Sequence, residues 1–113
     1  MWIVSFAIEA QQELISLPVQ ERVALLNAVA KLEAVGPRLP FPHQSAVKGV
    51  PGLRELRPRG GRSPWRGFYR QLGDGFVIAA IGPEAQVDQR NFDRAVRAAL
   101  ARIQALENET RTT

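Results

Sequence analysis

Two short turns in the second half of the chain constrain the fold most strongly. Asp74-Gly75 separates the run "WRGFYRQL" from the run "FVIAAI", and Gly60-Gly61 precedes the first of them. Glycine pairs of this kind between apolar runs are typical of β-hairpins, whose strands are antiparallel. We therefore predict strands at about residues 53–58, 64–72 and 75–82. The last is apolar throughout, so we expect it to be central and covered on both faces.

The rest of the chain predicts one more strand and three helices. "WIVSF" favours a strand at residues 2–6, and "EAQQELISL" favours a short helix that stops at Leu17, before Pro18. We expect Ser16 to cap a second helix that ends at Gly36-Pro37. Its core-facing stripe recurs at helical spacing and comprises Val23, Leu25, Leu26, Val29, Leu32 and Val35.

The last helix is predicted at about residues 89–107, after Asp88, and the proline-rich residues 36–52 are expected to be an irregular connector. The element order is then β-α-α-β-β-β-α. This predicts a single α+β domain over residues 1–107, with a small antiparallel sheet packed on helices. Residues 108–113 are expected to be a disordered tail.

Composition excludes several kinds of site. The 113 residues include no cysteine, which excludes disulfides, zinc–thiolate sites and thiol nucleophiles. The one histidine, His43, lies in the proline-rich connector, and no carboxylates cluster at ligand spacing, so we expect no metal and no cofactor. The chain has neither a signal-peptide pattern nor an apolar run of membrane-spanning length. We expect a cytoplasmic protein without membrane contact.

The positive charge is concentrated in one short stretch. Residues 52–71, "GLRELRPRGGRSPWRGFYRQ", hold six arginines and one glutamate, whereas the segments on either side carry net charges of 0 and −1. The net charge of +4 therefore comes from the predicted hairpin. Such a focused surplus is typical of proteins that bind polyanions, and a solvated hairpin without a ligand is the alternative.

Strand alternation suggests how these arginines could be used. If Leu56 points toward the helices, Arg57 points to the open face, where cross-strand pairing could bring it beside Arg66. Two such guanidinium groups hold a phosphate well. Trp65, Phe68 and Tyr69 are interleaved with them, and both a core role and a base-stacking role stay open.

Cleavage of RNA without a metal ion needs more than phosphate binding. The 2′-hydroxyl must be activated, the pentavalent phosphate stabilised and the 5′-oxygen protonated. Arginines stabilise the developing charge, but they transfer protons poorly. Lys48 and Tyr69 are the candidate general acid or base near the hairpin, and His43 is a more distant candidate.

The segment "AVKGVPGLRELRPRGGRSPWRGFYR", together with the element order, resembles the RelE/HigB superfamily of bacterial toxins, in particular its HigB-like, phage-derived branch. The resemblance implies an endoribonuclease that cuts mRNA on the ribosome without a metal ion. It also implies a cognate helix-turn-helix antitoxin as partner. Arg57 and Arg66 match the strand arginines of that superfamily, and the resemblance implies that Arg66 binds the scissile phosphate. Lys48 matches a basic position before them. RNA contacts are expected from Arg54, Arg59, Arg62, Arg70 and Arg90.

One segment departs from this pattern. After the last strand, relatives commonly carry a lysine or arginine that contributes to the active site, whereas this chain has Gly82-Pro83-Glu84-Ala85. Arg90 could reach back from the following helix. The sequence therefore leaves two alternatives open: a catalytically weakened protein of this fold that binds RNA, ribosome or antitoxin, and a basic interaction domain without nuclease ancestry.

Overall fold

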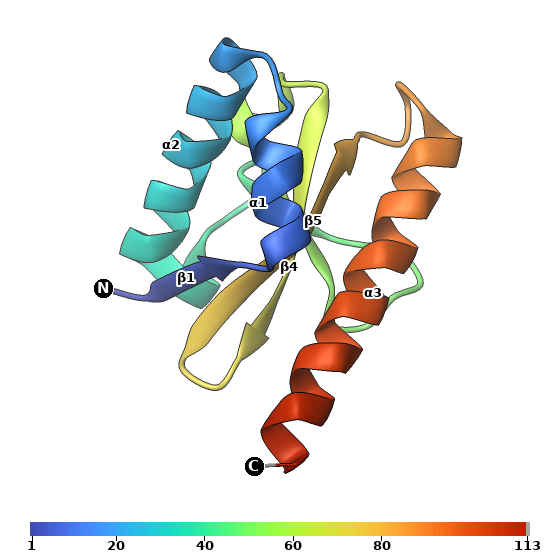
Figure 1. The fold of residues 1–113 in the computed structure, drawn as a ribbon. Coiled ribbons are helices and arrows are strands. Elements are labelled where there is room, and N and C mark those ends of the chain that lie inside the picture. The colour runs from blue at the N-terminus through green and yellow to red at the C-terminus, as the bar shows by residue number, and fades with distance from the viewer. Residues whose placement is uncertain (113) are drawn as a thin grey trace.

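The computed structural model describes residues 1–112, with side chains described as far as Thr110 (Figure 1). The strands are β1 (Ile3–Phe6), β2 (Gln44–Ala46), β3 (Arg54–Leu56), β4 (Trp65–Leu72) and β5 (Gly75–Pro83). The α-helices are α1 (Ile8–Ile15), α2 (Val19–Val35) and α3 (Gln89–Thr112), and two short 3-10 helices are η1 (Gly36–Arg38) and η2 (Pro58–Gly61). The predicted α+β class and element order are confirmed, and β2 is an addition inside the connector.

The five strands form one sheet in the order β1-β5-β4-β3-β2. Strands β3, β4 and β5 pair antiparallel, as the two turn signals predicted, and β2 also pairs antiparallel with β3, but β1 runs parallel to β5. The sheet is therefore mixed. No tight turn joins β1 to β5, because residues 7–74 lie between them in sequence, so hairpin geometry does not fix their direction.

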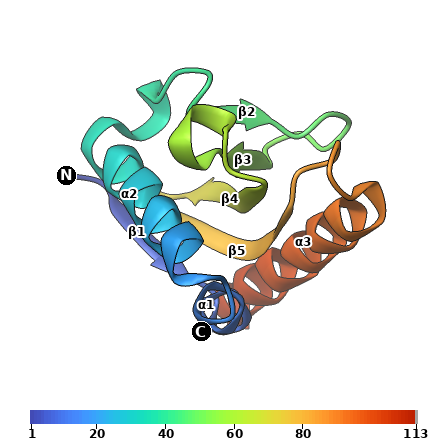
Figure 2. The same ribbon diagram turned by 90° about the horizontal axis from the view of Figure 1, so that it is seen from above.

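Helices cover both faces of this sheet (Figure 2). On one face, α1 and α2 pack over a core that includes Leu25, Leu32, Leu56 and Ile78. On the other face, α3 packs over Phe68, Ala80 and their neighbours. Strand β5, an interior strand between β1 and β4, is buried along most of its length, as predicted from its apolar sequence.

Helix α2 buries a narrower stripe than predicted. Leu25, Val29 and Leu32 are buried, whereas Val23, Leu26 and Val35 are exposed. Ala24 and Ala28 complete the buried side. The apolar residues of α2 extend around more than one side of the helix, and only the arc facing the sheet can be covered.

The helix ends also differ from the prediction. Ser16 ends α1, its hydroxyl donating to the carbonyl of Gln12 at 3.0 Å, and it does not cap α2. Pro18 precedes α2 directly. Helix α3 continues through most of the expected disordered tail to Thr112, since no glycine or proline interrupts residues 108–112, and residue 113 lies outside the described residues. None of the described helices is long and apolar enough to span a membrane.

Candidate functional site

The arginine-rich hairpin is built from β3, η2 and β4. Its register pairs Arg54 with Tyr69, Glu55 with Phe68, and Leu56 with Gly67. Leu56 is buried against the α2 side, so strand alternation turns Glu55 and Arg66 to the opposite side of the sheet. Arg66 and Glu55 meet there, as their ion pair at 3.2 Å shows.

Arg66 is buried at the centre of a polar network. Its side chain is 1% exposed, although the sequence predicted a position on the open face. Nε donates to Glu55, Nη1 to the carbonyls of Ser63 and Trp65, and Nη2 to the carbonyl of Gly61 and to Glu84. These five bonds equal the five N–H donors of a guanidinium group. Arg66 therefore has no donor left for a ligand in this conformation.

Two carboxylates balance the charge of this arginine. Glu55 Oε1 accepts from both Arg66 and Arg57 at 3.2 Å, and Glu84 pairs with Arg66 from the segment that follows β5. The backbone N–H of Glu84 donates to the carbonyl of Pro64 at 2.8 Å, which holds that segment against the start of β4. Burial lowers the pKa of Arg66, and the nearby charge of Arg57 acts in the same direction, while both carboxylates oppose it. We call Arg66, Glu55, Glu84 and Arg57 the Arg66 network.

Arg57 is the more accessible arginine of the network. Its Nε donates to the carbonyl of Pro42 at 3.0 Å, and its guanidinium carbon lies 5.3 Å from the centre of the Phe41 ring. Nη2 makes no hydrogen bond within the described residues. Arg57 also lines, with His43, a cavity of about 200 Å³ beside α2. Of the two expected phosphate ligands, Arg57 has the free donors.

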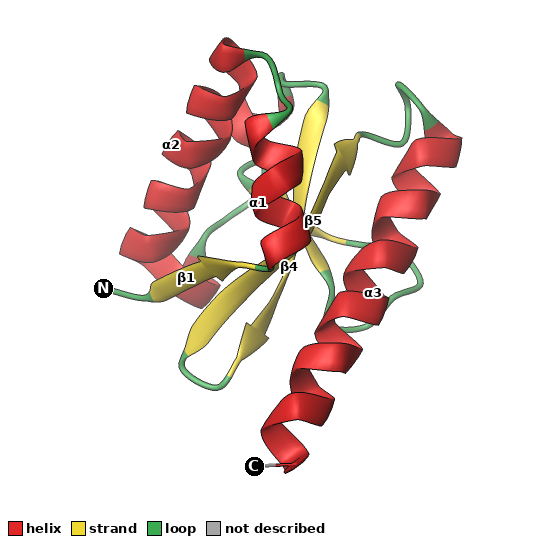
Figure 3. Ribbon diagram, in the orientation of Figure 1, coloured by secondary structure: helices red, strands yellow, loops and turns green. Residues whose placement is uncertain are grey.

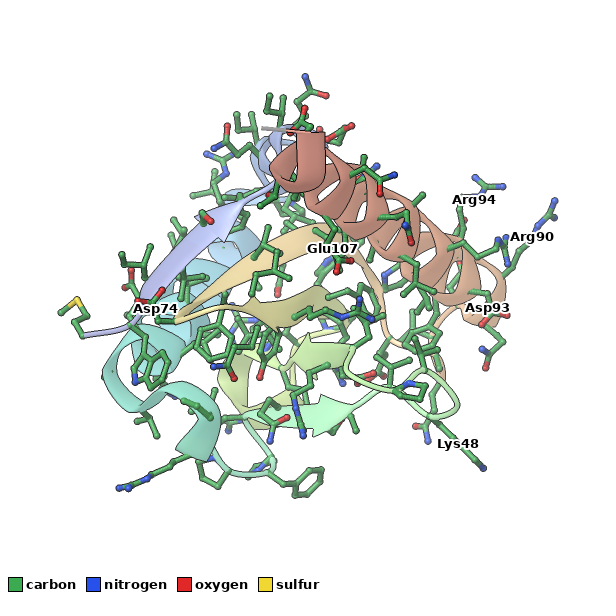
Figure 4. The ribbon with its side chains drawn as sticks, turned by 90° about the horizontal axis from the view of Figure 1, so that it is seen from below. Lys48, Asp74, Arg90, Asp93, Arg94 and Glu107 are labelled. Atoms are coloured by element: carbon green, nitrogen blue, oxygen red, sulfur yellow. The ribbon has the colours of Figure 1, made fainter. Side chains whose placement is uncertain are left out.

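The two candidate acid–base residues lie apart from this network. Tyr69 belongs to the core on the α2 side, edge-on to Phe76, and burial raises the pKa of its phenol to about 12. Lys48 is exposed in the loop between β2 and β3 and points away from the sheet (Figure 4). Neither side chain bonds to Arg66 or Arg57.

A second group of the predicted residues meets at the end of the sheet. Arg54, Tyr69 and Arg70 line one cavity of about 350 Å³. We call this space the sheet-end cavity, and its remaining lining residues are Pro37, Gln44, Gly52, Gln71 and Phe76. The structure thus places three of the predicted site residues at this cavity and two, Arg57 and Arg66, in the Arg66 network, while the others lie in neither.

The other expected RNA contacts differ in how far they are engaged. Arg59 makes a bidentate pair with Glu21 of α2, both bonds being 2.9 Å, and Ser63 donates to the same carboxylate. Arg62 is exposed and uses only its Nε, which donates to the carbonyl of Arg59. Arg90 lies at the start of α3 and projects into solvent (Figure 4).

Sequence reasoning missed the acids that control these arginines. Glu55 lies inside the arginine-rich stretch, and Glu84 stands where a basic residue was expected, so both were visible as opposite charges. That both acids pair with Arg66 follows only from the three-dimensional course of η2 and of the loop after β5, which is drawn in green in Figure 3. Among the described residues, no three His, Cys, Asp or Glu side chains are grouped as metal ligands.

Comparison with known proteins supports the resemblance. The family described as phage derived protein Gp49-like (DUF891) matches residues 12–81 of the chain. The fold matches a mutant of the E. coli toxin RelE in its free state, with a TM-score of 0.61 and 17% sequence identity, over 85% of this chain and 95% of that chain. No curated protein sequence matches. The chain therefore belongs to the phage-derived Gp49-like family, and it has the RelE fold.

Proposed function

We propose that this protein is the toxin of a toxin–antitoxin pair and cuts mRNA on the ribosome without a metal ion. The observation that carries the proposal is the pairing of Arg57 and Arg66 through Glu55 in the arginine-rich hairpin of the RelE-like sheet. These are the positions at which the superfamily places its phosphate-binding arginines. Guanidinium groups stabilise the charge that develops on a phosphate during attack by the 2′-hydroxyl.

Access to Arg66 requires one carboxylate to leave. The Glu84 side chain is 26% exposed and follows the end of β5, whereas that of Glu55 is 12% exposed and lies within β3. Glu84 is therefore the easier one for a phosphate to displace. In this scheme the RNA phosphate takes the place of the Glu84 carboxylate on Nη2 of Arg66.

The displaced carboxylate offers a general base that the sequence did not suggest. Tyr69 is a poor base, because a pKa of about 12 keeps its phenol protonated at neutral pH. Glu84 would stay beside the phosphate and accept the proton of the 2′-hydroxyl. The 2′-oxygen then attacks phosphorus, and the 5′-oxygen leaves with a proton from water.

A second function is favoured by the saturation of Arg66. If Glu84 never leaves, Arg66 only holds the hairpin together, and the protein binds RNA, ribosome or antitoxin without cutting. The exposed arginines of the hairpin and the partly free Arg57 suffice for such binding.

Induction in a bacterium, with primer extension on an abundant mRNA, separates these functions. The wild type should arrest growth and produce new cuts inside codons, and co-expression of the cognate helix-turn-helix antitoxin should suppress both. Arg57→Gln should lose both effects. Arg97→Gln, a change at an exposed α3 arginine outside the network, should keep them. A soluble, folded wild type without arrest or cuts would favour the binding function.

A further inference from the structure

We propose that the sheet-end cavity binds the phosphate of a ribonucleotide in single-stranded RNA. The inference rests on the proposed function, because it assigns a second contact of the same RNA. The cavity volume of about 350 Å³ lies in the range of sites that hold small ligands and exceeds what a phosphate group alone requires. No acidic residue lines the cavity, whereas two arginines do. The charge of the lining therefore favours an anion.

The two arginines keep most of their donors free. Arg54 uses one N–H, which donates to Gln44 Oε1 at 3.0 Å. Arg70 makes one long bond of 3.4 Å to the carbonyl of Pro51, and its Nη1 lies 3.9 Å from Glu107 of α3. Both arginines thus differ from Arg66, whose five donors are all occupied. Strand alternation places Arg54 and Tyr69 on the α2 side of the sheet, whereas Arg70 pairs with Val77 on the α3 side and turns its guanidinium toward Glu107. The Arg54 guanidinium is therefore the one that can bind a phosphate inside the cavity.

The side chain of Gln44 prepares one of these arginines for a ligand. Its Nε2 donates to the carbonyl of Leu39 at 2.9 Å while its Oε1 accepts from Arg54. The amide is therefore fixed at both ends and orients the Arg54 guanidinium. A donor that is oriented in advance loses less entropy on binding than a free side chain.

Tyr69 supplies a second donor at the inner wall of the cavity. The residue as a whole is 2% exposed, but its hydroxyl is not among the buried polar atoms without a partner, so it reaches the open space of the cavity that Tyr69 lines. Burial raises its pKa to about 12, with the Arg54 charge opposing, so at neutral pH it stays protonated and can donate to a phosphate oxygen.

The test is a titration of the whole chain with adenosine 5′-monophosphate by calorimetry, with adenosine and inorganic phosphate as comparison ligands. The monophosphate should bind more tightly than either comparison ligand, since it carries both the phosphate and the group that fills the remaining space. Arg54→Gln should weaken this binding about tenfold and Tyr69→Phe severalfold, whereas Arg70→Gln should change it little, because the Arg70 guanidinium faces α3. Arg97→Gln should bind like the wild type.

Two results would overturn the assignment: no binding of the monophosphate to the wild type, or binding that neither Arg54→Gln nor Tyr69→Phe weakens. Circular dichroism of each variant excludes unfolding as the cause of lost binding, and both arginines reach the surface, so the fold should tolerate their replacement. Cleavage of mRNA is measured separately. If the wild type binds the monophosphate, Arg54→Gln and Tyr69→Phe weaken that binding, and no RNA is cut, the cavity assignment is supported and the proposed nuclease function is contradicted. If the wild type cuts RNA but does not bind the monophosphate, the nuclease function is supported and the cavity assignment is contradicted.

Discussion

At the scale of single residues, Arg66 combines a strand position typical of a phosphate ligand with the contacts of a structural residue. Its guanidinium joins η2, the start of β4 and the segment after β5 through two carboxylates and three carbonyls. Such a network stabilises a fold only while it is complete. A buried charged group that loses its partner still bears the free-energy cost of desolvation, and no interaction offsets that cost. Replacement of Arg66 therefore disturbs folding as well as any catalysis.

We predict that Arg66→Met lowers the free energy of unfolding by about 3–5 kcal/mol, the usual cost of breaking a buried ion pair. The change leaves Glu55 and Glu84 without their common partner. Arg62→Met is the matched control, because Arg62 is exposed and its loss should cost about 0.5 kcal/mol or less. Urea denaturation measures both. Equal, small losses would show that the Arg66 network contributes little to stability.

Glu84→Gln separates phosphate binding from cleavage. The neutral amide holds Arg66 less strongly, so we predict that a short oligoribonucleotide binds about tenfold more tightly than to the wild type. Cleavage should fall, because the amide cannot accept the proton of the 2′-hydroxyl. Fluorescence anisotropy and primer extension measure the two effects. Unchanged RNA affinity in a folded variant would remove Glu84 from its proposed exchange with phosphate.

At the scale of elements, η2 is held in place by α2. Glu21 receives hydrogen bonds from Ser63 and Arg59, and these bonds lower its pKa below 4.5 in the folded protein, with the charge of Arg59 acting in the same direction. A carboxylate with a depressed folded pKa stabilises the fold above its unfolded pKa. That contribution is lost as the pH falls through the lower folded value.

The pH dependence of Glu21→Gln tests this link. The wild type should be more stable than the variant above pH 4.5, and the difference should shrink as the pH falls below that value. Urea denaturation over this acid range measures it. Glu9→Gln is the control, because Glu9 is exposed and makes no ion pair within the described residues. A difference for Glu21→Gln that does not vary with pH would rule out the ionised carboxylate as its source.

Turn chemistry explains which elements were predictable. Asp74-Gly75 fixes β4 and β5, and the helical spacing around Leu25 and Leu32 fixes α2. Strand β2 was missed because three residues among prolines show no alternation. The burial of Arg66 depends on Glu84, eighteen positions away, which meets it through the tertiary path of two loops. Local sequence patterns carry no information about a contact between residues so far apart in the chain. Strand alternation therefore predicted the side of the sheet on which Arg66 lies, but not that Glu84 and the neighbouring loops bury it.

At the scale of the whole molecule, the net charge overstates what is free to bind RNA. Six arginines lie within residues 52–71, but Arg66 is fully paired and Arg59 is held by Glu21. Arg54, Arg62 and Arg70 keep free donors on the surface. The polyanion site that we propose is therefore smaller than the sequence predicted, and it includes the sheet-end cavity.

The salt dependence of RNA binding should distinguish free from paired arginines. Each phosphate contact on single-stranded RNA contributes about 0.7 to the slope of log K against log salt concentration. We predict that Arg62→Gln reduces the slope by about that amount, whereas Arg59→Gln leaves it unchanged, because Arg59 already pairs with Glu21. Equal slopes for both variants would mean that pairing within the fold does not decide which arginines contact RNA.

The most direct test of the account is cleavage of mRNA on purified, programmed ribosomes in the presence of EDTA. Attack by the 2′-oxygen predicts fragments with 5′-hydroxyl ends and no cut where the attacking nucleotide carries a 2′-deoxyribose. Wild-type cleavage with these ends, absent from Arg57→Gln, is the result that the account predicts. A folded wild type that leaves the mRNA intact, or that cuts only when a divalent metal ion is added, would contradict it.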